Sequence, residues 1–228
     1  MQRRLSWILS GTGTLLVLYS IIAGVWTPVP DIPILYESIR NFFFHVPMWF
    51  AMLLMFLIGV IHSMRYLSSG RLDEDFKASS YLQTGVVFGI LGLITGAVWA
   101  RYTWGSWWSN DPKQNASAIT LIIYAAYFIL RRAIADRSVR GRVGAVYAVF
   151  AFAVAVPLLF ILPRMTDSLH PGSGGNPAFS SYDLDFRMRP IFYAGVAGWT
   201  LIGSWLSLLY ARVQRTAHEI VLLKHRLP

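Results

Sequence analysis

The chain has 228 residues, of which 55% are hydrophobic and 14% are charged, whereas about 25% of an ordinary soluble domain is charged. This composition predicts a membrane protein. In a membrane protein, the positive residues behind the net charge of +9 are expected to gather in the cytoplasmic loops. The charge therefore requires no nucleic-acid partner. The absence of Cys excludes disulfides, thiolate metal sites and iron–sulfur clusters within this chain. Any metal or redox cofactor must therefore be bound by His, Met or carboxylates.

Long stretches without a charged residue predict an all-α integral membrane protein with six transmembrane helices. About 20 helical residues cross the hydrocarbon core of a bilayer. The fourth stretch is short, but it extends backwards to Asp111-Pro112, an N-cap residue followed by proline at the first helical position. We predict a single transmembrane domain over residues 1–228, with helices at about 7–26, 42–64, 81–100, 112–130, 143–162 and 191–211.

The positive charges predict the orientation. When the loops are assigned to alternate sides, fourteen Lys and Arg fall on the side of the termini and six on the other, with five and six acidic residues respectively. The positive-inside rule therefore places both termini in the cytoplasm. The first stretch is too long for a signal-peptide core, so we expect it to be retained. Apart from Lys113, in the first turn of the fourth helix, no charged residue falls inside a predicted span, which argues against a proton pump or an ion-coupled transporter.

The first candidate ligand lies at the outer end of the second span, in Phe-Phe-Phe-His-Val-Pro-Met-Trp (42–49). His45 precedes Pro47 by two positions, and proline favours an extended predecessor and the first turn of a helix. We therefore expect His45 near the start of this helix, at the outer interface and among aromatic residues. The alternative is an interfacial histidine of an aromatic belt, without a ligand role.

A tryptophan-rich segment connects the third and fourth spans. The predicted outer loop 101–114 carries Trp104, Trp107 and Trp108, with a glycine between the indoles, and then Asp111. Tryptophan is enriched at membrane interfaces, so an anchoring belt is one interpretation. Indole faces grouped at the outer leaflet also offer an apolar platform for a flat ligand such as a porphyrin. Asp111 is expected to cap the fourth helix, a structural role that competes with any role toward a ligand.

The longest outer segment, the loop 163–190, carries the second candidate ligand, His170, in Ser-Leu-His-Pro-Gly. In the predicted topology only this histidine and His45 face outward. The other three histidines fall at the inner end of the second span or in the basic tail, and are His62, His218 and His225. Two neutral imidazoles can supply both axial ligands of a heme iron without any cysteine. A two-histidine site for another metal is the alternative.

Together these segments resemble the tryptophan-rich (WWD) heme-handling proteins of cytochrome c maturation. The resemblance rests on Trp-Gly-Ser-Trp-Trp-Ser-Asn-Asp-Pro (104–112), with Phe-His-Val-Pro around His45 and Leu-His-Pro-Gly around His170. It covers nearly the whole chain in number of spans, orientation and order of motifs. Within the family the chain looks most like the six-span CcmC type, because the CcmF and CcsA types are larger and carry extra histidines within their spans. Asn110 stands where the family commonly has tryptophan.

The resemblance implies that His45 and His170 are the axial ligands of a non-covalently bound heme b. The motif that meets the heme edge and a heme-accepting partner would be Trp104, Trp107, Trp108 and Asp111. Four outer cations are candidates to pair with the heme propionates, namely Arg40, Arg101, Lys113 and Arg164.

The resemblance also implies a place in the cell and a set of partners. It predicts a multi-pass protein of the bacterial inner (cytoplasmic) membrane that delivers heme to a periplasmic heme chaperone of the CcmE type. ABC transporter subunits of the CcmA and CcmB type, and a small CcmD-type subunit, would be further partners.

Other classes of function make different demands on the sequence. We find no Ser/His/Asp arrangement, paired carboxylates or P-loop, so we expect cofactor handling and no enzyme activity, with any ATP hydrolysis done by a partner. A CcsA-like component of heme delivery or ligation is one alternative. A b-type cytochrome that carries electrons is another, although it would normally place histidine pairs inside its helices. A membrane scaffold or permease with an ordinary tryptophan belt is the third.

Overall fold

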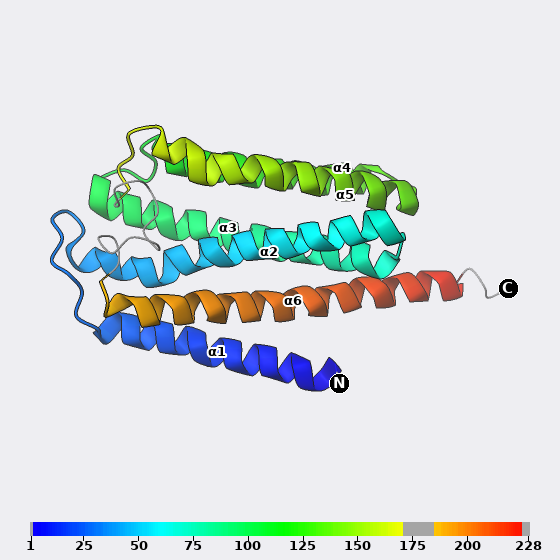
Figure 1. The fold of residues 1–228 in the computed structure, drawn as a ribbon, viewed down its shortest axis with the longest axis horizontal. Helices are drawn as coiled ribbons and strands as arrows, with labels where there is room; N and C mark the ends of the chain where they lie inside the picture. The colour runs from blue at the N-terminus through cyan, green and yellow to red at the C-terminus, as the bar shows by residue number, and fades with distance from the viewer. Residues whose placement is uncertain (1, 171–184, 225–228) are drawn as a thin grey trace.

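The computed structural model describes residues 2–170 and 185–224, and in this part of the chain six helices are long and apolar enough to cross a membrane. They run side by side, with both chain ends at the same end of the bundle (Figure 1). The helices are α1 (Gln2–Trp26), α2 (Phe42–Ser69), α3 (Leu72–Trp104), α4 (Pro112–Ala133), α5 (Arg137–Val156) and α6 (Met188–Lys224). Short helical turns lie at η1 (Tyr36–Asn41), η2 (Pro157–Ile161) and η3 (Leu162–Arg164). The chain is thus an all-α, multi-pass membrane protein.

Several helices extend beyond the charge-free stretches, because their ends carry charged residues that the hydrophobic pattern leaves out. The third helix is the clearest case, since it begins at Leu72 and has Asp73, Glu74 and Asp75 in its first turn. Acidic side chains stabilise the positive end of a helix dipole. Gly70 and Gly105 adopt left-handed conformations at the C-terminal ends of α2 and α3, which glycine tolerates without steric cost.

Four of the helices form a bundle and two lie beside it. α2 packs against α3 and α5, and α4 packs against the same two helices from the other side. The centre of this bundle is filled by Met52, Met55, Phe56, Leu82 and Tyr124. α6 packs across α2 and α3, and α1 packs mainly on α6 (Figure 1).

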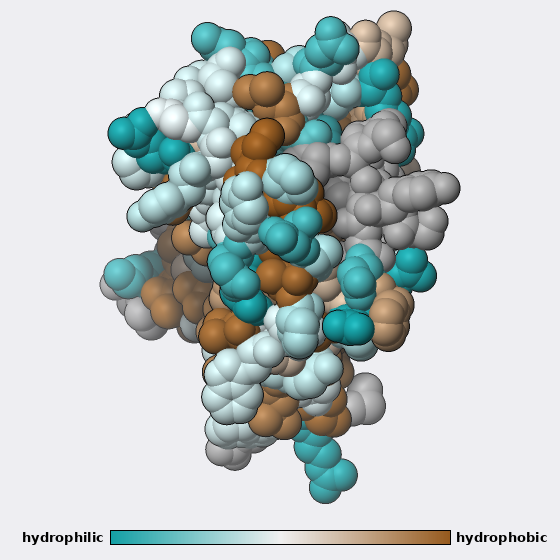
Figure 2. Space-filling model, turned by 90° about the vertical axis from the view of Figure 1, so that its left-hand side faces the viewer, coloured by the Kyte–Doolittle hydropathy of each residue, from teal (hydrophilic) through white to brown (hydrophobic). Residues whose placement is uncertain are grey.

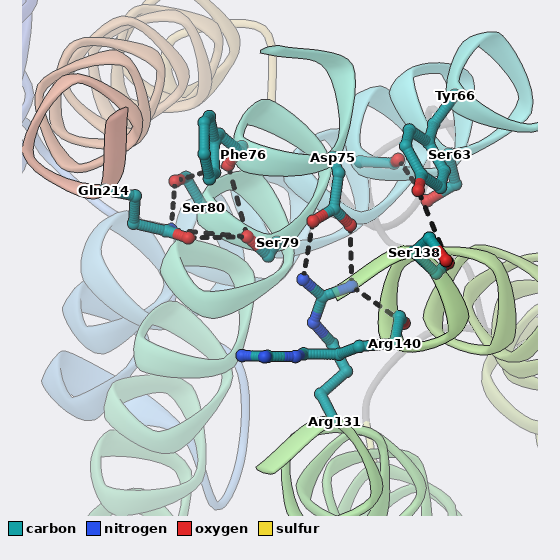
Figure 3. A network of polar contacts seen from close by, with 11 residues as sticks. Ser63, Tyr66, Asp75, Phe76, Ser79, Ser80, Arg131, Ser138, Arg140 and Gln214 are labelled. Atoms are coloured by element: carbon teal, nitrogen blue, oxygen red, sulfur yellow. Dashed lines mark hydrogen bonds and ion pairs between the residues drawn. The ribbon is translucent and has the colours of Figure 1, made fainter. Parts of the chain in front are cut away.

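The two ends of the bundle differ. The end that carries the α1–α2 and α3–α4 connections mixes polar and apolar side chains on its surface (Figure 2). At the opposite end, polar contacts link α2 to α5, α4 to α3 and α5, and α6 to α3 (Figure 3). There the Arg131 guanidinium donates to both carboxylate oxygens of Asp75, at 2.7 and 2.9 Å, and both side chains are nearly buried. The Gln214 amide donates to Ser79 and Ser80 and so ties α6 to α3.

The Arg131–Asp75 pair generates a prediction about stability. Replacing Arg131 with Met leaves the Asp75 carboxylate buried without its partner, which costs about 3 kcal/mol of unfolding free energy. Denaturation of the purified protein in detergent measures this loss. Arg132→Met is the matched control, because Arg132 is exposed on the same turn of α4. Equal stability of the two variants would contradict a structural role for the buried pair.

Candidate functional site

His45 lies in the first turn of α2, where it contacts α3 closely. Its Nδ1 atom lies 3.2 Å from the hydroxyl of Thr95. The imidazole sits over Gly96, where an added Cβ would lie only 2.6 Å from the ring. Trp49 and Trp99 approach the imidazole edge-to-face, with ring centroids 6.2 and 5.9 Å away. The His45 ring is thus held between two helices and two indoles.

His170 lies in the segment that follows α5, and a buried carboxylate holds it. Its Nδ1 atom is 2.8 Å from Oδ1 of Asp111, whose side chain has no exposed surface. The other carboxylate oxygen accepts from the Ser168 hydroxyl at 2.9 Å and from the Leu169 backbone N–H at 2.7 Å. Oδ1 also accepts from the backbone N–H of Lys113, as the predicted N-cap of α4. Asp111 therefore caps α4 and orients His170 at the same time.

These contacts also determine the charge on Asp111. Burial alone would raise the pKa of this carboxyl group. The hydrogen bond and charge of His170, and the backbone N–H groups of Leu169 and Lys113, outweigh burial and hold the pKa well below its ordinary value. Asp111 is therefore ionised at neutral pH and is a strong acceptor for the imidazole N–H.

Both histidines line one cavity of about 160 Å³ at the end of the bundle shown in Figure 2. Its wall is mostly apolar and comes from α2, α3, α4 and η2, and includes Trp49, Phe50, Leu53, Leu93, Leu159 and Phe160. Lys113 and Gln114 add polar groups to the wall. A smaller cavity of about 20 Å³ is also lined by both histidines. The fold thus brings together two residues that are 125 positions apart in the sequence.

The three tryptophans of the predicted loop occupy different environments. Trp104 still belongs to α3 and lies edge-to-face on His170, with ring centroids 4.9 Å apart. Trp108 lines the larger cavity, and its indole N–H donates to the Asn115 side chain. Trp107 is 58% exposed and lines neither cavity. The irregular part of the loop is therefore shorter than the predicted 101–114 and runs over residues 105–111.

Asn110 has a structural explanation. Its backbone is left-handed, with φ of 56°, and asparagine tolerates this region better than most residues other than glycine. Its carbonyl oxygen accepts from the Asn115 side chain at 3.0 Å. The left-handed backbone at Asn110 reverses the chain just before Asp111, the N-cap residue of α4.

Sequence reasoning missed the groups that support His45. Thr95 and Gly96 carry no motif of their own, and Trp49 reads as part of an aromatic belt. The π-helical turn η2 begins at Pro157, which cannot donate the next hydrogen bond of α5. This turn places Leu159 and Phe160 in the cavity wall, and π-helical turns are often found at functional sites. The position of Thr95 and Gly96 one helical turn before Trp99 is the feature of the sequence that could have indicated the contact with His45.

Two further histidines of the described residues, His62 and His218, do not line this cavity. His62 pairs with Glu74 at 2.6 Å, and His218 lies against Phe76 in the C-terminal part of α6. His225 and residues 171–184 of the predicted outer loop lie outside the described residues. The fold and site together define a multi-pass helical membrane protein with a histidine pair in an apolar cavity at one end of its bundle.

Comparison with known proteins identifies the family. The model of the cytochrome c assembly protein family matches residues 2–170. The chain belongs to this family, and the matched region contains both histidines and the tryptophan-rich segment.

The relatives are distant over the full length. The heme exporter protein C of Escherichia coli K12 is 24% identical over 199 residues, which cover 84% of this chain and 74% of the relative. That of Rhodobacter capsulatus is 25% identical over 230 residues, or 98% of this chain and 91% of the relative. The cytochrome c biogenesis protein CcsA of Prochlorococcus marinus MIT 9515 is 41% identical over 85 residues, or 36% of this chain and 26% of the relative.

The double role of Asp111 generates a second prediction. Asp111→Ala removes a helix cap and leaves the partners in the 168–170 segment without their acceptor, so we expect a loss of about 2–3 kcal/mol in unfolding free energy. Asp136→Ala is the matched control, because Asp136 caps α5 but bonds only locally. Thermal unfolding in detergent compares the two. A loss no larger at Asp111 than at Asp136 would mean that the contacts to the 168–170 segment contribute nothing.

Proposed function

We propose that this protein binds heme at the outer leaflet through His45 and His170 and passes it on during cytochrome c maturation. The observation that carries the proposal is that both imidazoles line one cavity while each Nδ1 is engaged by another group. With Nδ1 as the N–H donor, the Nε2 lone pair of each ring is available to a metal. Two such donors match the axial positions of a non-covalently bound heme b.

The remaining lining residues fit a porphyrin. The wall offers apolar and indole surfaces for a flat macrocycle. Bound heme would supply an iron atom that takes two nitrogen ligands. It would also bring two propionate groups, which need cations nearby. His170 lies on an irregular segment, whereas His45 lies on a transmembrane helix, and groups on loops keep their positions less well than groups on packed helices. His170 is therefore the ligand that we expect to move.

Lys113 is the cation that we propose for the propionates. Of the four outer cations named from the sequence, it lines the cavity. Arg40 pairs with Glu37 and donates to the carbonyls at the end of α1. Arg101 donates to the Gly105 carbonyl and is exposed.

The distribution of positive charge and the names of the relatives support a direction of heme delivery. The excess of Lys and Arg lies on the side of the termini, so we propose that the termini are cytoplasmic and that the cavity faces the periplasm of a bacterial inner membrane. The relatives named heme exporter protein C support delivery to a periplasmic heme chaperone. ABC transporter subunits and a small membrane subunit would assist. Trp107, which is exposed and directly precedes the cavity-lining Trp108, is a candidate contact for the chaperone.

A second candidate is a CcsA-like role in heme ligation, which is favoured by the 41% identity to CcsA over 85 residues. The two roles differ in the recipient of the heme. Transfer to an isolated heme chaperone supports the first, and direct transfer to an apocytochrome supports the second.

The ligand assignment is tested by absorption spectra of the purified protein after heme is supplied. We expect a six-coordinate, low-spin heme in the wild type. His45→Ala and His170→Ala should each lose the heme or change its coordination, because each removes one axial nitrogen. His62→Ala is the matched control, since His62 lies at the other end of α2. Unaltered spectra in both outer variants would remove the assignment, and a wild type without bound heme would remove the proposed function.

The tryptophans give a separate prediction. Trp108→Ala removes apolar wall and should weaken heme retention about tenfold. Trp107→Ala should leave retention within about twofold, because Trp107 lines neither cavity. Titration of heme into each variant measures both effects. Equal weakening in the two variants would favour a general interfacial belt over a heme platform.

A further inference from the structure

We propose that Thr95 is a positioning residue that presents Nε2 of His45 to the ligand and makes His45 the fixed member of the histidine pair. This inference rests on the proposed function, since it concerns how the same site holds its ligand. It is based on contacts between α2 and α3 that the sequence motifs do not reveal.

The first step is the direction of the hydrogen bond. The Thr95 hydroxyl lies 2.9 Å from the Leu91 carbonyl and 3.1 Å from the Gly92 carbonyl, one turn earlier in α3. A hydroxyl has one hydrogen, and here both carbonyls are acceptors for it. The hydroxyl oxygen then accepts from Nδ1 of His45 at 3.2 Å. This selects the imidazole tautomer with hydrogen on Nδ1 and a free lone pair on Nε2.

The second step is the restraint on the ring and its backbone. Gly96 lets the imidazole lie directly on α3, where any larger residue would meet it at 2.6 Å. The Asn41 amide, at the start of α2, donates to the backbone carbonyl of Thr95 at 3.1 Å. The same residue of α3 therefore binds the His45 side chain and the N-terminal end of its helix.

The third step is the contrast between the two ligands. His45 lies on a transmembrane helix and bonds to a neighbouring transmembrane helix. His170 lies on an irregular segment and bonds to Asp111 in the α3–α4 connection. Groups on packed helices keep their geometry better than groups on loops. His45 thus stays in place while the His170 segment admits and releases the ligand.

Thr95→Val tests this inference, because valine keeps the shape of threonine and removes the hydroxyl. Nitrogen-15 NMR of histidine-labelled, heme-free protein reports the His45 tautomer, with the signal identified by its loss in His45→Ala. We expect the valine variant to lose the single Nδ1–H form and to bind heme about tenfold more weakly. Thr95→Ser restores the hydroxyl and should return both properties to the wild-type values.

Thr200→Val is the matched control, since the Thr200 hydroxyl makes the same backbone contact in α6, to the Val196 carbonyl at 2.7 Å. It should leave the tautomer and the heme affinity unchanged. An unchanged His45 tautomer in Thr95→Val, or equal heme loss in Thr95→Val and Thr200→Val, overturns the inference. These outcomes are separate from failure of the proposed function, because the tautomer is measured without heme and the wild-type spectrum tests heme binding itself.

Discussion

The end of the bundle that carries the α1–α2 and α3–α4 connections depends on one buried carboxylate, Asp111. Asp111 accepts from the backbone of α4, from Ser168, from Leu169 and from the His170 ring. A carboxylate without exposed surface is stable only when its oxygens are satisfied, so each of these contacts offsets the cost of burying Asp111. They join the tryptophan-rich connection to the segment that bears the second histidine. The connection places His170 in the wall of the cavity that His45 also lines.

The two ends of the bundle use charge differently. At the end that carries the termini, buried ion pairs such as Arg131–Asp75 join the helices. At the other end, the contacts of His45 and Asp111 engage Nδ1 of each histidine and leave an apolar cavity between the rings. An end with an apolar cavity between two histidines is consistent with the proposed binding and release of heme.

Much of the candidate site could be predicted from the sequence, because its two histidines lie within two residues of a proline and its indoles are close together in the chain. The cavity is lined by three of the residues singled out from the sequence, His45, Trp108 and His170. The extent of the loop was less predictable, since residues 101–104 continue α3 until Gly105 turns left-handed. The separate environments of Trp104, Trp107 and Trp108 depend on that turn. No pattern in the sequence distinguishes them.

The sequence by itself determined the number of spans, because about 20 apolar residues are required for each crossing and charged residues separate the stretches. It also predicted that, of the five histidines, His45 and His170 face outward. Only the tertiary structure decided which group each imidazole meets, since Thr95 is 50 residues from His45 and Asp111 is 59 residues from His170. Such pairings arise from the packing of helices that are distant in sequence. Local sequence patterns do not encode them.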